Sequence, residues 1–156
     1  IARRRTRGIG GVHVVRGDGC RLPFATGSFD VAITVLTLHH FDDADVREVL
    51  GEMGRVARER VVANDLERCL PNYVGARLLA TTLWRRDPLT RHDGPASVLR
   101  SFTPAELRAA GEEAGLRDVR VRRRFPWRLV LEARPPRGDL EAGRRARERR
   151  SAGSVS

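Results

Sequence analysis

Two apolar segments near the start of the chain end in polar turns and predict strands of a parallel sheet. Residues 13–16 form a short β-branched run that stops at the turn signal GDG of residues 17–19. Residues 29–38 form a second run, rich in Val, Ile and Thr. A strand that is apolar on both faces belongs in the middle of a parallel sheet covered by helices. Because ligands bind beyond the carboxyl ends of such strands, we expect a functional site at residues 18–20 and 37–40.

The middle of the chain alternates helical and strand patterns. Apolar residues recur at helical spacing over residues 46–57, and the acidic stretch 42–45 before them provides N-cap candidates. Residues 60–64 predict the next strand. Residues 71–86 begin with Pro and are apolar almost all round, which predicts a helix that is deeply buried or covers a pocket. Residues 87–101 contain two Pro and one Gly and predict a long loop.

The last predicted elements are a capped helix and an antiparallel pair of strands. Residues 103–106, TPAE, form a capping box with Pro at the first helical position, and a later glycine ends the helix. Residues 119–125 and 128–133 alternate like antiparallel strands. The final stretch holds Arg, Glu, Gly and Ser without apolar anchors, which predicts a disordered or frayed tail. We therefore divide the chain into a domain of residues 1–134 and a tail of residues 135–156.

The chain is strongly basic, with a formal net charge of +10 over 156 residues. Such an excess is typical of nucleic-acid binding. However, all 30 basic residues are Arg and they are spread along the chain, which indicates biased coding composition rather than a phosphate-binding face. Aromatic residues, which stack on single-stranded bases, make up only 5%. We therefore expect no nucleic-acid partner, and no window is apolar over the length that a membrane span requires.

The two cysteines, Cys20 and Cys69, form no CxxC pair and no His/Cys ligand pattern. We therefore expect no structural zinc and a reducing, cytoplasmic compartment. No signal segment follows Ile1, so we expect the chain to start inside a longer protein.

Three motifs together resemble class I S-adenosylmethionine-dependent methyltransferases. They are GDGCRLPF at residues 17–24, SFDV at residues 28–31 and LHHF at residues 38–41. The similarity is greatest to the small-molecule branch that includes the quinone-biosynthesis methyltransferases, and it covers roughly residues 1–134. The resemblance implies an α/β, three-layer Rossmann-like fold whose mostly parallel sheet ends in an antiparallel hairpin. It also implies S-adenosylmethionine as the cofactor.

The same resemblance implies that the chain is the C-terminal part of such an enzyme. The family's first strand with its Gly-rich turn, and a second strand ending in a ribose-binding acid, would lie upstream of Ile1. The glycines of residues 8–11 precede a strand, whereas a nucleotide-binding glycine loop must follow one. Because the missing second strand would pair with residues 12–16, we expect residues 12–16 to be detached from the sheet or poorly paired. The expected sheet strands are residues 31–37, 60–64, 119–125 and 128–133.

Asp18 is the leading cofactor-binding candidate. An acid just past a strand end can accept a hydrogen bond from an adenine amine, and such a charged hydrogen bond contributes about 1.5–3 kcal/mol. The alternative is an Asp that only makes an Asx turn. By resemblance, Gly19 and Cys20 would contribute backbone and a small apolar wall. Val35 would touch the methionine part of the cofactor, the alternative being a plain core valine.

His39 is the catalytic candidate, because it lies with His40 at the mouth of the expected cleft. A neutral imidazole there could take a proton from a substrate hydroxyl, since the ordinary imidazole pKa is about 6.5. The alternative is that one of the two histidines caps the helix or packs under the loop. Methyl transfer from a sulfonium needs mainly alignment, so a general base is not required. Asp65, at a strand end, and His92-Asp93 could face a substrate or be turn residues.

These patterns lead to one prediction and two alternatives. The prediction is S-adenosylmethionine-dependent methyl transfer to a small-molecule acceptor by direct displacement, with the substrate under residues 71–102. One alternative is an RNA methyltransferase, which would need a clustered basic face with stacking aromatics. The other is a fragment without chemistry that is inert or serves as an interaction module.

Overall fold

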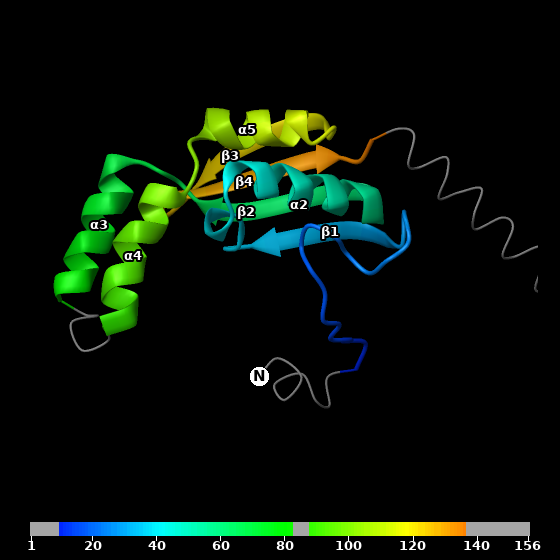
Figure 1. Ribbon diagram of the computed structural model, residues 1–156. Helices are drawn as coiled ribbons and strands as arrows, with labels where there is room; N and C mark the ends of the chain where they lie inside the picture. Colours follow the sequence, from blue (N-terminus) through cyan, green and yellow to red (C-terminus); the bar gives the residue numbers. More distant parts are fainter. Residues whose placement is uncertain (1–9, 83–87, 137–156) are drawn as a thin grey trace, which may run out of the picture.

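The computed structural model describes residues 10–82 and 88–136 as a mixed sheet with helices packed on it (Figure 1). The strands are β1 (Phe29–Val35), β2 (Ala57–Leu66), β3 (Arg117–Arg124) and β4 (Arg128–Arg134). The helices are α2 (Asp43–Val56), α3 (Leu70–Thr81), α4 (Pro88–Arg100) and α5 (Pro104–Glu113), with a short 3-10 helix, η1 (Leu38–His40), after β1. The predicted α/β class is confirmed.

The sheet has the strand order β1-β2-β4-β3. β1 and β2 are parallel, with Val35 opposite Asn64, whereas β4 is antiparallel to both of its neighbours. Residues 12–16 belong to no strand. The four strands predicted at residues 31–37, 60–64, 119–125 and 128–133 are therefore confirmed, as is the detachment of residues 12–16 from the sheet. The predicted strand at residues 13–16 is wrong, because the described residues supply no partner strand for it. Because β1 and β2 are parallel, their carboxyl ends meet at one edge of the sheet, where a ligand site is expected.

The hydrophobic core lies between one face of the sheet and the helices α2 and α5 (Figure 1). Its largest fully buried side chains include Leu50 of α2, Leu107 of α5, and Leu129 and Leu131 of β4. Full burial of one such side chain contributes about 1.5–3 kcal/mol. This layer holds α2, and the residues that precede it, in a fixed place beside the carboxyl ends of the parallel strands.

The helix α5 begins and ends as its sequence predicts. The Thr103 hydroxyl accepts a hydrogen bond from the Glu106 backbone N–H at 3.3 Å, and the Glu106 carboxylate accepts one from the Thr103 N–H at 2.9 Å. These reciprocal bonds are the predicted capping box. Past the C-terminal end of the helix, Gly115 takes a φ of +79°, a conformation that glycine adopts without strain.

β1 lies at the edge of the sheet and not in its middle, so that prediction is wrong. Alternate side chains are exposed on one face, with Val31 at 41%, Ile33 at 65% and Val35 at 54% of their full accessibility. Ala32 and Thr34, which point the other way, are partly buried. The physical reason is that residues 10–82 and 88–136 supply neither a strand beyond β1 nor a helix over this face.

The predicted loop of residues 87–101 is also wrong, because these residues include the helix α4 with Pro95 inside it. α4 packs against α3 as a helical pair beside the end of the sheet (Figure 1). Ala76 and Ala80 of α3 and Val98 of α4 are buried. Tertiary packing has here outweighed the low helix propensity of Gly and Pro.

α3 confirms a helix within residues 71–86 but not its burial. Leu70, Val74 and Leu78 are spaced four residues apart on one side of the helix, and each is more than half exposed. Residues 83–87, and the predicted tail beyond residue 136, lie outside the described residues. Within the described residues, no helix has the length and apolar character needed to cross a membrane.

Candidate active site

The carboxylate of Asp65, at the carboxyl end of β2, joins β2 to η1. Its Oδ2 atom accepts hydrogen bonds from the backbone N–H groups of Leu38, at 2.8 Å, and Thr37, at 3.2 Å. Its Oδ1 atom lies 2.6 Å from His39 Nδ1 and 2.7 Å from the Leu66 backbone N. The Asp65 side chain is fully buried, so these donors replace the water that it loses on folding.

Burial alone would raise the pKa of Asp65, but the net pKa lies below its ordinary value. The hydrogen bonds from His39, Leu66 and Leu38, with the electrostatic attraction of His39, outweigh the burial because they favour the charged carboxylate. Asp65 is therefore ionised at neutral pH. An ionised carboxylate has no hydrogen to donate, which determines how His39 must face it.

His39 is buried, at 5% exposure, while its neighbour His40 is exposed. The two rings lie with centroids 4.1 Å apart and tilted by 46°. Among the described residues, the only buried side-chain nitrogen or oxygen without a hydrogen-bond partner is Asn64 Oδ1. His39 Nε2 makes no hydrogen bond there either, and it is not among the buried unpaired atoms, so Nε2 reaches solvent.

Asp18 forms the Asx turn that was its alternative role. Its Oδ1 atom accepts the Cys20 backbone N–H at 3.0 Å, and its carbonyl accepts the Arg21 N–H at 3.2 Å. The residue is exposed, and its Oδ2 atom has no hydrogen bond within the described part of the chain. The turn therefore uses one carboxylate oxygen and leaves the other available to a ligand. The cofactor-binding role of Asp18 stays a prediction.

The turn of residues 18–20 and the η1 segment lie on neighbouring parts of one surface. A Cβ built on Gly19 would lie 3.4 Å from Val49 of α2 and 3.7 Å from Phe41, the residue directly after η1. Two polar clusters about twenty residues apart in sequence thus flank the start of α2. Val35, at the end of β1, is exposed, so its alternative role as a core residue does not apply in this structure.

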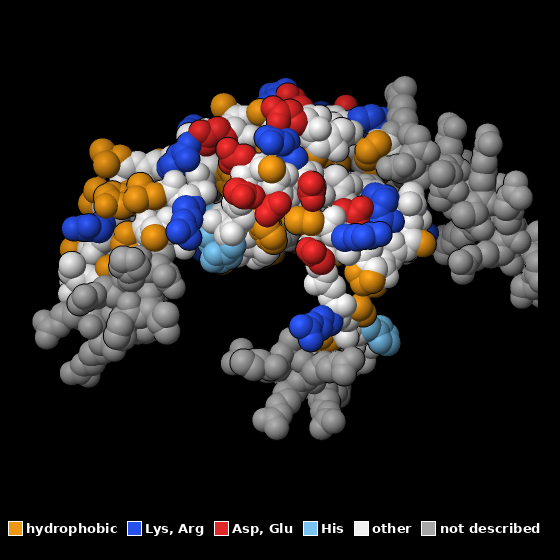
Figure 2. All heavy atoms as spheres, in the orientation of Figure 1, with side chains coloured by type: hydrophobic (Ala, Val, Ile, Leu, Met, Phe, Trp, Pro, Cys, Tyr) orange, Lys and Arg blue, Asp and Glu red, His pale blue; other side chains and the backbone are white. Residues whose placement is uncertain are grey.

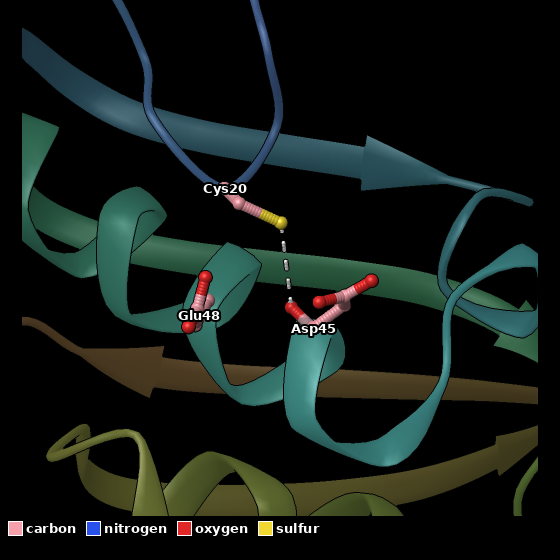
Figure 3. A group of neighbouring side chains, drawn as sticks. All are labelled: Cys20, Asp45 and Glu48. Carbon is pink, nitrogen blue, oxygen red and sulfur yellow. Dashed lines mark hydrogen bonds between the residues drawn. The ribbon is translucent and has the colours of Figure 1, made fainter.

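Acidic side chains surround Cys20 (Figure 3). The thiol is a weak donor to the Asp45 carbonyl, with Sγ and O 4.0 Å apart. The thiol sulfur of Cys20 and carboxylate oxygens of Asp45 and Glu48 all lie within 4.8 Å of one another. Burial, followed by the charges of Asp45, Asp18, Glu48 and Asp42, raises the pKa of the Cys20 thiol. The thiol therefore stays protonated at neutral pH and is a poor nucleophile.

The same acids raise the pKa of Asp45, chiefly through the charge of Asp42 and a hydrogen bond to it. Figure 2 shows acidic side chains gathered over α2, on a protein that is basic as a whole. This end of α2 is therefore locally negative. It suits a ligand that carries positive charge better than one that carries phosphate.

The pairing of Asp65 with His39 is the feature that the sequence did not predict. Both residues are candidates in the sequence, but the sequence predicts no contact between them. Asp65 is predicted either to face a substrate or to be a turn residue. The available signal was a pair of parallel strands that both end in polar residues, because such ends meet in space. The side chains of His92 and Asp93 lie outside the described residues.

The comparisons with known proteins agree with this architecture. Residues 1–62 match the family model described as a methyltransferase domain. No curated protein sequence matches the chain. Among solved structures, a SAM-dependent methyltransferase from Aquifex aeolicus aligns with a TM-score of 0.57 and 19% identity, over 85% of this chain and 59% of that one. The chain has the methyltransferase fold.

Two further solved structures agree on the fold. CalO1, a methyltransferase in calicheamicin biosynthesis solved in its SAH-bound form, has a TM-score of 0.54 and 25% identity over 81% of this chain and 35% of its own. A SAM-dependent methyltransferase from Thermotoga maritima, titled a possible histamine N-methyltransferase, has a TM-score of 0.55 and 21% identity over 85% of this chain and 66% of its own. The chain thus spans between about a third and two thirds of these methyltransferases' length.

Proposed function

We propose that this chain is the C-terminal part of a methyltransferase that uses S-adenosylmethionine to methylate a small molecule, in the manner of the quinone-biosynthesis branch. One observation carries the proposal. The segment that matches the methyltransferase family, residues 1–62, contains both the turn of residues 18–20 and η1. The fold brings these two clusters to the start of α2, at the carboxyl end of β1.

The residues of the turn fit the adenine end of S-adenosylmethionine. The Oδ2 atom of Asp18 is exposed and can accept a hydrogen bond from the adenine amine, while Oδ1 keeps the turn closed. The Gly19 N–H makes no hydrogen bond within the described residues and can donate to a ring nitrogen. The protonated Cys20 provides a small apolar wall, and exposed Val35 at the end of β1 provides a contact for the methionine part.

When bound, S-adenosylmethionine supplies an electrophilic methyl group on a positively charged sulfur. The acids around Cys20 create a negative potential that favours such a cation over neutral relatives. The residues of this chain hold the adenine and align the acceptor, and alignment is the main requirement of a direct displacement. His39, whose Nε2 reaches solvent at the same edge of the sheet, is the residue that we propose takes a proton from the acceptor.

The exposed face of β1 supports the view that this chain works with a further segment. Val31, Ile33 and Val35 form an apolar row on an unpaired edge strand, which soluble domains normally cover. The described residues also contain no Gly-rich turn that follows a strand. A covering segment with such a turn would complete both the sheet and the methionine end of the site. The two free cysteines suit the reducing cytoplasm that we propose as its location.

Titration of the isotopically labelled chain with S-adenosylmethionine tests the proposal. NMR detects millimolar affinities, so it reports binding even when part of the site is missing. We expect chemical-shift changes at residues 18–20 and 35–40. No change at either cluster would contradict the proposed function.

A further inference from the structure

The pair formed by His39 and Asp65 has the arrangement of a general base and the residue that orients it. Asp65 is fully buried and fixed by three backbone N–H groups, two of them from the segment that carries His39. Its Oδ1 atom then meets His39 Nδ1 at 2.6 Å. This hydrogen bond fixes the orientation of the imidazole ring, which cannot rotate without breaking it.

This contact determines which imidazole nitrogen carries the hydrogen. Asp65 is ionised at neutral pH and can only accept, so Nδ1 of a neutral His39 must be the donor. The other nitrogen, Nε2, then presents a lone pair. That atom is the one that reaches solvent at the carboxyl ends of β1 and β2.

We propose that Asp65 is a positioning residue that keeps His39 as the Nδ1–H tautomer, so that Nε2 accepts the proton of a hydroxyl group on the methyl acceptor. This inference rests on the proposed function and names its substrate class: an alcohol or phenol. In the step, the acceptor oxygen forms a bond to the methyl carbon while the carbon–sulfur bond breaks, and its electron pair stays on sulfur. The hydroxyl proton moves to Nε2, and the Asp65 carboxylate stabilises the imidazolium that results.

The hydroxyl class follows from what a base of this kind can do. A neutral hydroxyl is a weak nucleophile until its proton is removed, so an adjacent imidazole accelerates its attack. An amine attacks through its own lone pair and can lose its proton to water afterwards. A carbon acid is generally too weak for an imidazole whose conjugate acid has an ordinary pKa of about 6.5. A buried, oriented imidazole is therefore of most use to an oxygen acceptor.

If Asp65 served only to anchor η1, a substitution that keeps its shape would not be expected to set the tautomer of His39. Asp65→Asn separates the two roles. With its oxygen toward Leu38 and Thr37, the amide leaves only the Leu66 N–H without an acceptor, whereas the reverse orientation leaves two N–H groups without one. The amide NH₂ is therefore expected to face Nδ1, which then becomes the acceptor. The hydrogen moves to Nε2, and the nitrogen that faces the acceptor no longer has a free lone pair.

The tautomer is measured on the chain itself by long-range ¹H–¹⁵N NMR of the imidazoles at about pH 8.5, where an ordinary imidazole is neutral. His39→Gln assigns the signal, and His40→Gln is the matched control on the adjacent ring. We expect Nδ1–H in the wild type and in His40→Gln, and Nε2–H in Asp65→Asn. An Nε2–H tautomer in the wild type, or an unchanged tautomer in a folded Asp65→Asn, would overturn the proposal.

The acceptor class is tested on the same samples with phenol as the probe and anisole, its methyl ether, as the control. Phenol donates a hydrogen bond and anisole does not, so we expect phenol to shift the His39 Nε2 resonance and anisole to leave it in place. Equal responses, or no response to phenol, would overturn the hydroxyl assignment. Binding of S-adenosylmethionine at residues 18–20 is measured separately, so failure of the dyad and failure of the proposed function give different results.

Discussion

At the scale of single residues, two carboxylates at the same edge of the sheet have opposite surroundings. Asp65 is buried and every hydrogen bond that it makes is internal, whereas Asp18 is exposed and keeps one oxygen available. Burial with complete pairing makes an acid structural or orienting; exposure with an available oxygen makes it a ligand-binding group. The two residues should therefore respond differently to substitution.

Asp18→Ala should weaken the binding of S-adenosylmethionine about ten-fold, because loss of one charged hydrogen bond costs at least about 1.4 kcal/mol. It should leave the fold intact, since the side chain bonds only to its own turn. The dissociation constant is taken from an NMR titration, with a melting curve to confirm folding. Asp43→Ala, which removes an exposed acid from the first turn of α2, is the charge-matched control and should leave binding within about two-fold. Equal affinities of the two variants for S-adenosylmethionine would mean that Asp18 serves only as a turn residue.

Asp65→Ala should instead destabilise the fold, by about 3 kcal/mol or more, because it leaves Leu38, Thr37 and His39 without their buried acceptor. Urea unfolding measures this loss. The folded-state pKa of Asp65 lies below its ordinary value of 3.8. Its stabilisation is therefore fully present above pH 4 or so and is lost as the pH falls through the folded-state pKa.

Asp65→Asn cannot show this acid-dependent loss, so the wild type should lose more unfolding free energy than Asp65→Asn between neutral pH and the acid end of the titration. Other carboxylates with lowered pKa values, Glu52 and Glu106, are common to both proteins and cancel in the comparison. Parallel stability curves for the two proteins would show that folding does not lower the pKa of Asp65.

At the scale of elements, β1 has one exposed face and one partly buried face. Ile33→Thr, on the exposed face, should change the free energy of unfolding by less than about 0.5 kcal/mol. It should also reduce self-association, because an unpaired apolar edge strand is a site of intermolecular pairing. Val61→Thr, on the buried face of the adjacent strand, is the matched control and should cost about 1–3 kcal/mol. Urea unfolding and sedimentation measure both effects. A large cost for Ile33→Thr would mean that this face is covered.

At the scale of the whole molecule, the sequence predicted the four strands of the sheet because each has a strong local pattern or motif. The capping box of α5 was equally clear, since its two hydrogen bonds lie within four residues. The helix α4 was missed because Pro95 and Gly94 read as a loop, and only contact with α3 makes the helix favourable. The edge position of β1 was missed because the sequence pattern of an apolar strand does not depend on whether its neighbouring strand is present.

The candidate site was predicted in part for the same reason. The turn at Asp18 and the corner at His39 each have a local signature. The contact between His39 and Asp65 joins residues 26 positions apart and depends on the parallel register of β1 and β2. No local pattern encodes such a contact, so it became visible only in the fold.

The proposed function is tested most directly by NMR titration of this chain with S-adenosylmethionine up to millimolar concentration. Adenosine, which keeps the adenine and lacks the charged methionine part, is the comparison ligand. We expect weak binding, since the described residues supply only part of the site. S-adenosylmethionine should shift residues 18–20 together with Val35 and His39, whereas adenosine should shift residues 18–20 alone. Chemical-shift changes confined to the far strand β3, or no changes at residues 18–20, Val35 and His39, would contradict the proposed function.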